Sequence, residues 1–151
     1  MLKSYVSEGV LSKANPDYYA YFGFRDWWRF PLVYPYSIHT IDEVDYGCLY
    51  NEGNVKNYED INNQKLINMD ICGITHLNLD QNYLLLQVDK DSRFREENEV
   101  VKGEFILFNF NTAAAKRFVS KDELLTEAKK LGFSGKLELM TLREYDDLFW
   151  E

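Results

Sequence analysis

The sequence is poor in the residues that mark unusual folds. It holds two cysteines, three prolines and eight glycines in 151 residues, and nowhere do 18 apolar residues follow one another. This composition excludes collagen, a disulfide-rich scaffold and a membrane-spanning helix. The first residues also lack the apolar core of a secretory leader. Cys48 and Cys72, 24 positions apart, make no disulfide framework and are compatible with a reducing compartment. We therefore predict a cytoplasmic protein without a membrane partner.

What is present is typical of an ordinary globular domain. The chain is 46% hydrophobic and 28% charged. A domain of roughly 150 residues buries about two-thirds of the surface that its unfolded chain exposes, so a core needs no metal or disulfide. We predict a single domain over residues 1–151.

Negative charge is concentrated in one stretch of the chain. Residues 42–80 contain eight acidic and two basic residues, within a chain whose net charge is −8. Such a field repels phosphate backbones and attracts basic surfaces. A basic protein is therefore the expected partner and nucleic acid is not, although acidic surfaces also serve solubility alone.

The C-terminal part predicts two helices. Ser120 with Glu123, and Thr141 with Glu144, have the spacing of a capping box, and apolar residues occupy the flanking staple positions. The first helix should run from about Lys121 to Leu131, with Gly132 as its left-handed C′ residue. The second should be short and continue to the terminus.

Upstream, short apolar runs predict strands over 83–88 and 104–110, with a shorter one over 116–119. Residues 66–79 predict a bent strand with a bulge at Gly73. Strands followed by helices, without regular alternation, favour an α+β fold. We predict a meander-like antiparallel sheet of about five to six strands packed against the C-terminal helices.

Ten of the 24 aromatic residues lie within residues 18–36. Asn15 and Pro16 indicate a helix start, and Pro31 to Ile41 reads as an edge strand because prolines are confined to sheet edges. Charged residues such as Arg29 interrupt the cluster, so some of its aromatic side chains are expected near the surface. They would suit a protein interface or a flat ligand, and they could equally build the core.

Few residues have the pattern of a catalytic or metal site. His39, Asp42 and Glu43 form the densest group of such side chains, but they converge only if a turn follows Ile41. His76 reads as a structural histidine, with pairing to His39 left open. Cys48 would act as a nucleophile only beside His39. We expect no zinc site and no cofactor, because the two histidines and two cysteines are dispersed.

Three functions remain, in this order. The first is a non-enzymatic protein-binding domain, possibly an immunity-type inhibitor of a basic toxin. The second is a small-ligand or carbohydrate-binding domain that uses the aromatic cluster at 18–36. The third is a metal-dependent or hydrolytic enzyme that uses His39, Asp42 and Glu43. The first hypothesis assigns partner contacts to aromatic and acidic residues: Trp27, Trp28, Tyr34, Tyr36, Asp42, Glu43, Asp45, Glu59 and Asp60.

Overall fold

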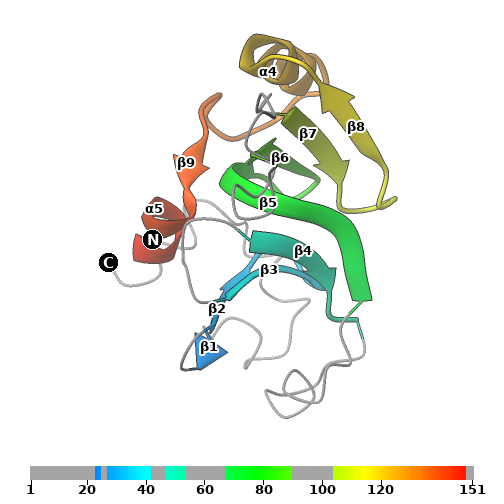
Figure 1. Ribbon diagram of the computed structural model, residues 1–151. Coiled ribbons are helices and arrows are strands. Elements are labelled where there is room, and N and C mark those ends of the chain that lie inside the picture. Colours follow the sequence, from blue (N-terminus) through cyan, green and yellow to red (C-terminus); the bar gives the residue numbers. More distant parts are fainter. Residues whose placement is uncertain (1–22, 25–26, 42–46, 54–66, 90–103, 149–151) are drawn as a thin grey trace, which may run out of the picture.

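The computed structural model describes residues 23–24, 27–41, 47–53, 67–89 and 104–148 (Figure 1). The expected helix start at Asn15 lies outside these residues. The described elements are β1 (Gly23–Phe24), β2 (Trp27–Pro31), β3 (Tyr36–Ile41), β4 (Gly47–Asn51), β5 (Ile67–Leu79), β6 (Tyr83–Val88), β7 (Glu104–Asn109), β8 (Ala115–Phe118), α4 (Lys121–Lys130), β9 (Met140–Thr141) and α5 (Leu142–Asp147).

The strands form one antiparallel sheet in which β1 to β8 follow one another in chain order, while β9 pairs with β5. The predicted α+β fold and meander are confirmed. The sheet has nine strands within the described residues, more than the five to six predicted. Two of the additional strands, β1 and β9, are two residues long and carry no periodic signal.

The predicted edge strand from Pro31 to Ile41 is wrong. The segment contains a hairpin turn between β2 and β3, with a cis peptide bond between Tyr34 and Pro35. Strand β3 lies between β2 and β4 and is not an edge. The prolines are tolerated because Pro31 ends β2 and Pro35 lies in the turn, where no continuous ladder is required.

Strand β5 is long and strongly curved (Figure 1). Its first half pairs with β4 and its second half with β6. Gly47 pairs with Ile74 while the adjacent Cys48 pairs with Cys72, so Gly73 is the extra residue of a bulge. Its φ of 82° lies in the left-handed region. The bulge predicted at Gly73 is confirmed, and it redirects the strand from one neighbour to the other.

Substitution of Gly73 should lower the free energy of unfolding more than substitution of Gly132, the glycine that follows α4. Gly73 and Gly132 both have φ of 82°, but a methyl group on Gly73 would lie 2.3 Å from the carbonyl oxygen of Asp89, whereas one on Gly132 meets nothing within 4 Å. Gly132→Ala should therefore cost about 1–2 kcal/mol through left-handed strain alone. Gly73→Ala should cost about 2–5 kcal/mol, because the backbone must also shift. Urea unfolding measures both, and equal losses would contradict this account.

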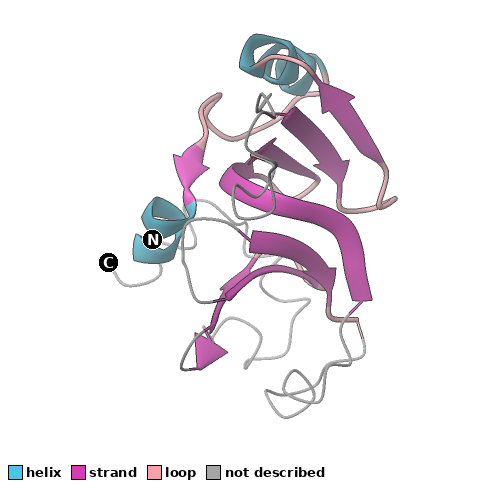
Figure 2. Ribbon diagram, in the orientation of Figure 1, coloured by secondary structure: helices cyan, strands magenta, loops and turns pink. Residues whose placement is uncertain are grey.

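Strands β6 and β7 are covered on both faces. Leu85 and Leu107 pack against Leu124, Ala128 and Phe133 of α4 and the turn that follows it. Their neighbours in sequence point to the opposite face, where they join the main core. This arrangement explains why both strands read as nearly continuous apolar runs. Figure 2 shows α4 beside these strands and α5 next to β9, at a separate place on the sheet.

Both C-terminal helices begin at the predicted caps. The Ser120 side chain accepts a hydrogen bond from the backbone of Glu123, and Thr141 with Glu144 forms a complete capping box. The staple predicted before α4 is not formed, because Val119 is 82% exposed. At the other end, Gly132 donates to Lys129 and Phe133 donates to Ala128. This is the Schellman pattern expected around a left-handed glycine.

The connection between α4 and β9 is fixed to the β5–β6 hairpin by two buried polar side chains. The Asn78 amide donates to the backbone oxygens of Lys136 and Glu138. The Asp80 carboxylate accepts from the backbone of Asn82 and Tyr83 at the turn and from Ser134 across the connection. Asp80 thus has a structural role.

Candidate functional site

The densest group of polar side chains lies on one face of β2, β3 and β4. Arg29 in β2 is the register partner of His39 in β3, and Ser37 precedes His39 by two residues on the same face. Glu52 follows the last residue of β4. The other face of these strands carries Phe30, Ile38 and Leu49, which are buried in the main core. Strand alternation therefore gathers the polar residues on one side.

A buried ion pair is the centre of this group. The Arg29 guanidinium donates from Nε to Glu52 Oε2 and from Nη2 to Glu52 Oε1, each at 2.8 Å. Both side chains are 1% exposed. Two parallel charge-assisted bonds fix the orientation of the carboxylate as well as its charge. The charge of Arg29 was the reason to expect some neighbouring aromatic side chains near the surface, but Arg29 itself is buried.

Ser37 and His39 complete the shell around this carboxylate. Ser37 donates from its hydroxyl to Glu52 Oε2. His39 Nε2 lies 3.3 Å from the same oxygen and 2.9 Å from Ser37 Oγ. Because a carboxylate only accepts hydrogen bonds, we infer that Nε2 carries the proton. The His39 ring also packs on the ring of Tyr50, with centroids 4.8 Å apart.

The protonation states follow from burial and hydrogen bonding. Burial acts to raise the pKa of Glu52, but hydrogen bonds from His39, Arg29 and Ser37, with the charge of Arg29, lower this pKa to about 2. Burial lowers the pKa of His39, against the opposing effect of Glu52. At neutral pH the group is therefore an ionised Glu52, a cationic Arg29 and a neutral His39.

A serine, a histidine and an acid invite comparison with a catalytic triad, but the geometry differs. In a triad the serine and the acid contact opposite nitrogens of the imidazole. Here Ser37 Oγ and Glu52 Oε2 both meet Nε2. Ser37 is also completely buried. The arrangement orients and neutralises the buried charges but gives no path for a hydroxyl to attack a substrate.

The structure describes only one residue of the predicted enzyme site. His39 turns toward Ser37 and Glu52, whereas Asp42 and Glu43 lie outside the described residues. Among the described side chains, no group of three or more potential metal ligands converges. His76 contacts Thr75 and pairs across strands with Gln87 and Thr141, so the alternative pairing with His39 is not formed.

The predicted aromatic contacts fall into different environments. Tyr36 is 5% exposed and packs in the core against Phe108 and Phe110, with ring centroids 5.1 and 5.6 Å away. Its assignment to a binding surface is therefore withdrawn. Trp28 and Tyr34 are half-buried; the Trp28 ring packs against the main core, and Tyr34 lies in the β2–β3 turn. Trp27 belongs to β2, but its side chain lies outside the described set.

The predicted acidic contacts, Asp42, Glu43, Asp45, Glu59 and Asp60, all lie outside the described residues. Their attachment points are nevertheless defined. The connection containing residues 42–46 enters β4 at Gly47, and the one containing residues 54–66 leaves after Gly53 at the opposite end. The acids therefore fall into two groups attached at opposite ends of β4.

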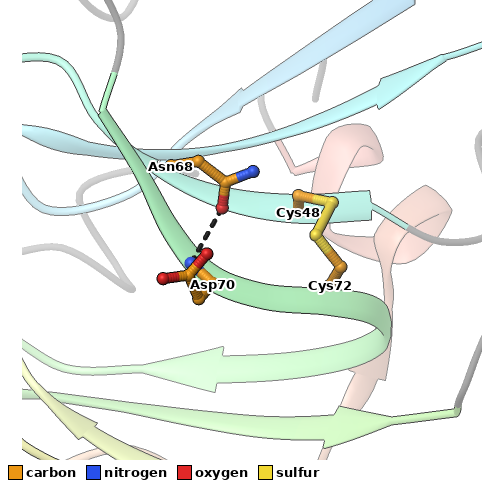
Figure 3. The surroundings of a disulfide bond; sticks show 4 residues. All are labelled: Cys48, Asn68, Asp70 and Cys72. Carbon is orange, nitrogen blue, oxygen red and sulfur yellow. Dashed lines mark hydrogen bonds between the residues drawn. A yellow bond between two sulfur atoms is a disulfide. The ribbon is translucent and has the colours of Figure 1, made fainter.

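Cys48 and Cys72 form a disulfide between β4 and β5 (Figure 3). The sequence predicted no disulfide framework from these two cysteines, and the structure joins them in one bond. The sequence offered no signal, because pairing depends on a strand register set between residues 24 positions apart. Cys48 is also the register partner of His39, as a nucleophilic role would require, but its sulfur is bonded to Cys72.

The network also contains residues that the sequence did not identify. Glu52 follows Arg29 by 23 positions, and no local motif connects them. The alternation of Trp28, Arg29 and Phe30 predicts that Arg29 lies on the face of the sheet opposite the core. It does not predict that Arg29 is buried on that face. The ion pair is visible only once β2, β3 and β4 are in register.

A comparison of the chain with known protein families, with curated proteins and with solved structures finds no match. Neither helix in the described part of the chain has the length and apolar content needed to cross a membrane.

Proposed function

We propose that the chain is a non-enzymatic protein-binding domain whose partner is a basic protein, in the manner of acidic inhibitors that neutralise basic toxins. The observation that carries the proposal is the excess of six negative charges in residues 42–80. Two acids in this segment serve internal contacts: Glu52 pairs with Arg29, and Asp80 holds the β5–β6 turn. The other six acids are assigned to the external field, and among them Asp70 is exposed.

We assign five acids of this segment to the contact with the partner: Asp42, Glu43, Asp45, Glu59 and Asp60. Exposed charges are screened beyond about 8 Å at physiological salt, so this field acts most strongly on a partner that is already close.

Aromatic residues are the proposed anchors. Trp28 and Tyr34 keep part of their surface exposed while the rest is packed, and Trp27 stays in the proposal on its sequence position. Aromatic residues held in this way bind partners at low entropic cost. Charge would govern the encounter with the partner, and the aromatic residues would govern its retention.

The proposal also places the protein in the cytoplasm, on the basis of its low cysteine content. In such a compartment the disulfide would meet thiol reductants.

The experiment compares two variants that carry the same change in charge. One replaces Asp42, Glu43 and Asp45 by their amides; the other makes the same exchange at the exposed residues Asp122, Glu138 and Asp147. The native protein is immobilised and exposed to an extract of the cells from which it comes. It should retain a protein of high pI in a defined stoichiometry. The first variant should lose most of this binding and the second should keep it. Retention of acidic proteins only, or equal losses in both variants, would contradict the proposal.

A further inference from the structure

The Cys48–Cys72 disulfide joins two strands at a directly paired position, with the Cα atoms 4.0 Å apart. Figure 3 shows it bridging β4 and β5, with Asn68 and Asp70 further along β5. The bond closes a loop that contains the whole connection between the two strands. It therefore determines where the first half of β5 lies on the sheet.

The ladder around this bond is broken on both sides. On one side Gly73 is the extra residue of the bulge described above. On the other side the next pair is Tyr50 with Asn68, so three residues of β5 stand opposite the single Leu49. Within this stretch Asp70 has φ of 60°, and its N–H donates to the Asn68 side chain at 2.8 Å. The disulfide is thus an isolated point of attachment between two irregularities.

The first half of β5 has little other support. The pairing of β6 with β5 reaches only to Ile74, with one further backbone bond from Asp89 to Gly73. Among the described strands, β4 is therefore the one neighbour of residues 67–72. Ile67 is 56% exposed, Ile71 is buried in the main core, and Met69 is partly buried and packs against that core. Segments with few buried contacts and an interrupted ladder open at low free energy.

The two sulfur atoms differ in access. Cys72 is exposed, whereas Cys48 is half-buried, and the neighbouring Asn68 and Asp70 are exposed as well. A thiolate must reach one sulfur in line with the bond that it breaks, so access selects the point of attack. The exposed side is Cys72.

We propose that this disulfide is a thiol-exchange site, at which a dithiol reductant attacks Cys72 in the folded protein. A thiolate of the reductant bonds to Cys72 Sγ, and the electron pair of the broken S–S bond leaves on Cys48 Sγ, which takes up a proton. The second thiol of the reductant then attacks the mixed disulfide and releases Cys72. The reductant ends as a disulfide, and two electrons have passed to the protein as two thiols.

The structural consequence is local. Without the bond, residues 67–70 lose the attachment that holds their interrupted pairing with Tyr50 and Asn51. Ile71 stays in the core and limits the opening. Strands β6 and β7, which are buried on both faces, do not depend on the bond. Reduction therefore loosens one end of β5 and leaves the rest of the sheet folded.

The test uses dithiothreitol as the dithiol and the complete chain under native conditions. Free thiols are counted over time, and amide hydrogen exchange is followed in residues 67–70 and, as an internal control, in 83–88 and 104–109. Reduction should be much faster than global unfolding, and exchange in 67–70 should accelerate about tenfold or more while the control strands stay unchanged. Thiols that appear only at the rate of global unfolding, or exchange that increases equally in all three segments, would overturn the proposal.

Two single variants test the point of attack. Cys48→Ser leaves Cys72 as a free thiol, and Cys72→Ser leaves Cys48. Iodoacetamide should alkylate Cys72 in the first variant about tenfold faster than Cys48 in the second, since reaction rates follow access when the two thiols are otherwise alike. Equal rates, or faster alkylation of Cys48, would contradict attack at Cys72. Circular dichroism of both variants checks that each is folded before the rates are compared.

Discussion

Replacement of Arg29 by methionine is expected to lower the free energy of unfolding by about 3–5 kcal/mol, because Glu52 is then left as a buried carboxylate without its cation. Methionine retains most of the buried apolar stem of arginine, so the loss reports mainly on charge. The remaining contacts of Glu52, from Ser37 and His39, come from neutral groups. Urea unfolding at neutral pH measures the effect.

The double variant Arg29→Met/Glu52→Leu separates charge from packing. Removal of both partners eliminates the uncompensated charge, and buried ion pairs exchanged for apolar residues are often neutral or stabilising. We therefore expect the double variant to recover most of the stability lost by Arg29→Met. A double variant as unstable as the single one would show that the guanidinium is required for packing and not for charge compensation.

The same pair predicts how stability depends on pH. The pKa of Glu52 is lowered from 4.5 to about 2, so the native state holds this carboxylate ionised while the unfolded chain takes up a proton. The resulting stability is present above pH 4.5 and is lost as the pH falls toward 2. One lowered carboxyl of this size contributes about 3 kcal/mol. The pKa of His39 is also lowered, which extends the loss upward toward pH 6.5. The double variant lacks Glu52, so of these two losses of stability at low pH it should keep only the one due to His39.

Tyr36→Ala is the second substitution with a large expected effect. Tyr36 lies in the core between Phe108 and Phe110, and loss of a buried aromatic side chain typically costs about 3–5 kcal/mol. Tyr34→Ala, in the half-buried turn two residues earlier, is the matched control and should cost about 1 kcal/mol or less. Thermal and urea unfolding distinguish them. If both substitutions lowered the free energy of unfolding by a similar amount, the assignment of Tyr36 to the core and of Tyr34 to the turn would be contradicted.

Local patterns predicted the parts of the fold that depend on local interactions. The capping residues Ser120 and Thr141 define where α4 and α5 begin, because a cap is satisfied within a few residues of itself. Gly73 identified the bulge in β5 because a left-handed position within a strand favours glycine. Strands β6 and β7 were evident from their continuous apolar sequence.

The features that were missed depend on contacts between distant residues. The positions of Pro31 and Pro35 are compatible with an edge strand and also with the hairpin that is formed. Only the pairing of β3 with β4 distinguishes the two structures. The disulfide and the Arg29–Glu52 pair likewise require that β2 to β5 be in register. The burial of Arg29 was not predicted, because sequence alternation assigns a residue to a face of the sheet but does not show what covers that face.

Steering of a basic partner by the acidic segment is tested most directly by the salt dependence of association. Association of the captured partner is measured by stopped flow from about 20 to about 150 mM salt, with native protein and with the variant that carries amides at Asp42, Glu43 and Asp45. For the native protein the association rate should fall steeply with salt. For the variant it should be about tenfold lower at low salt and nearly independent of salt, with dissociation little changed. An association rate and salt slope equal to those of the native protein would contradict the claim and leave the charge as a determinant of solubility.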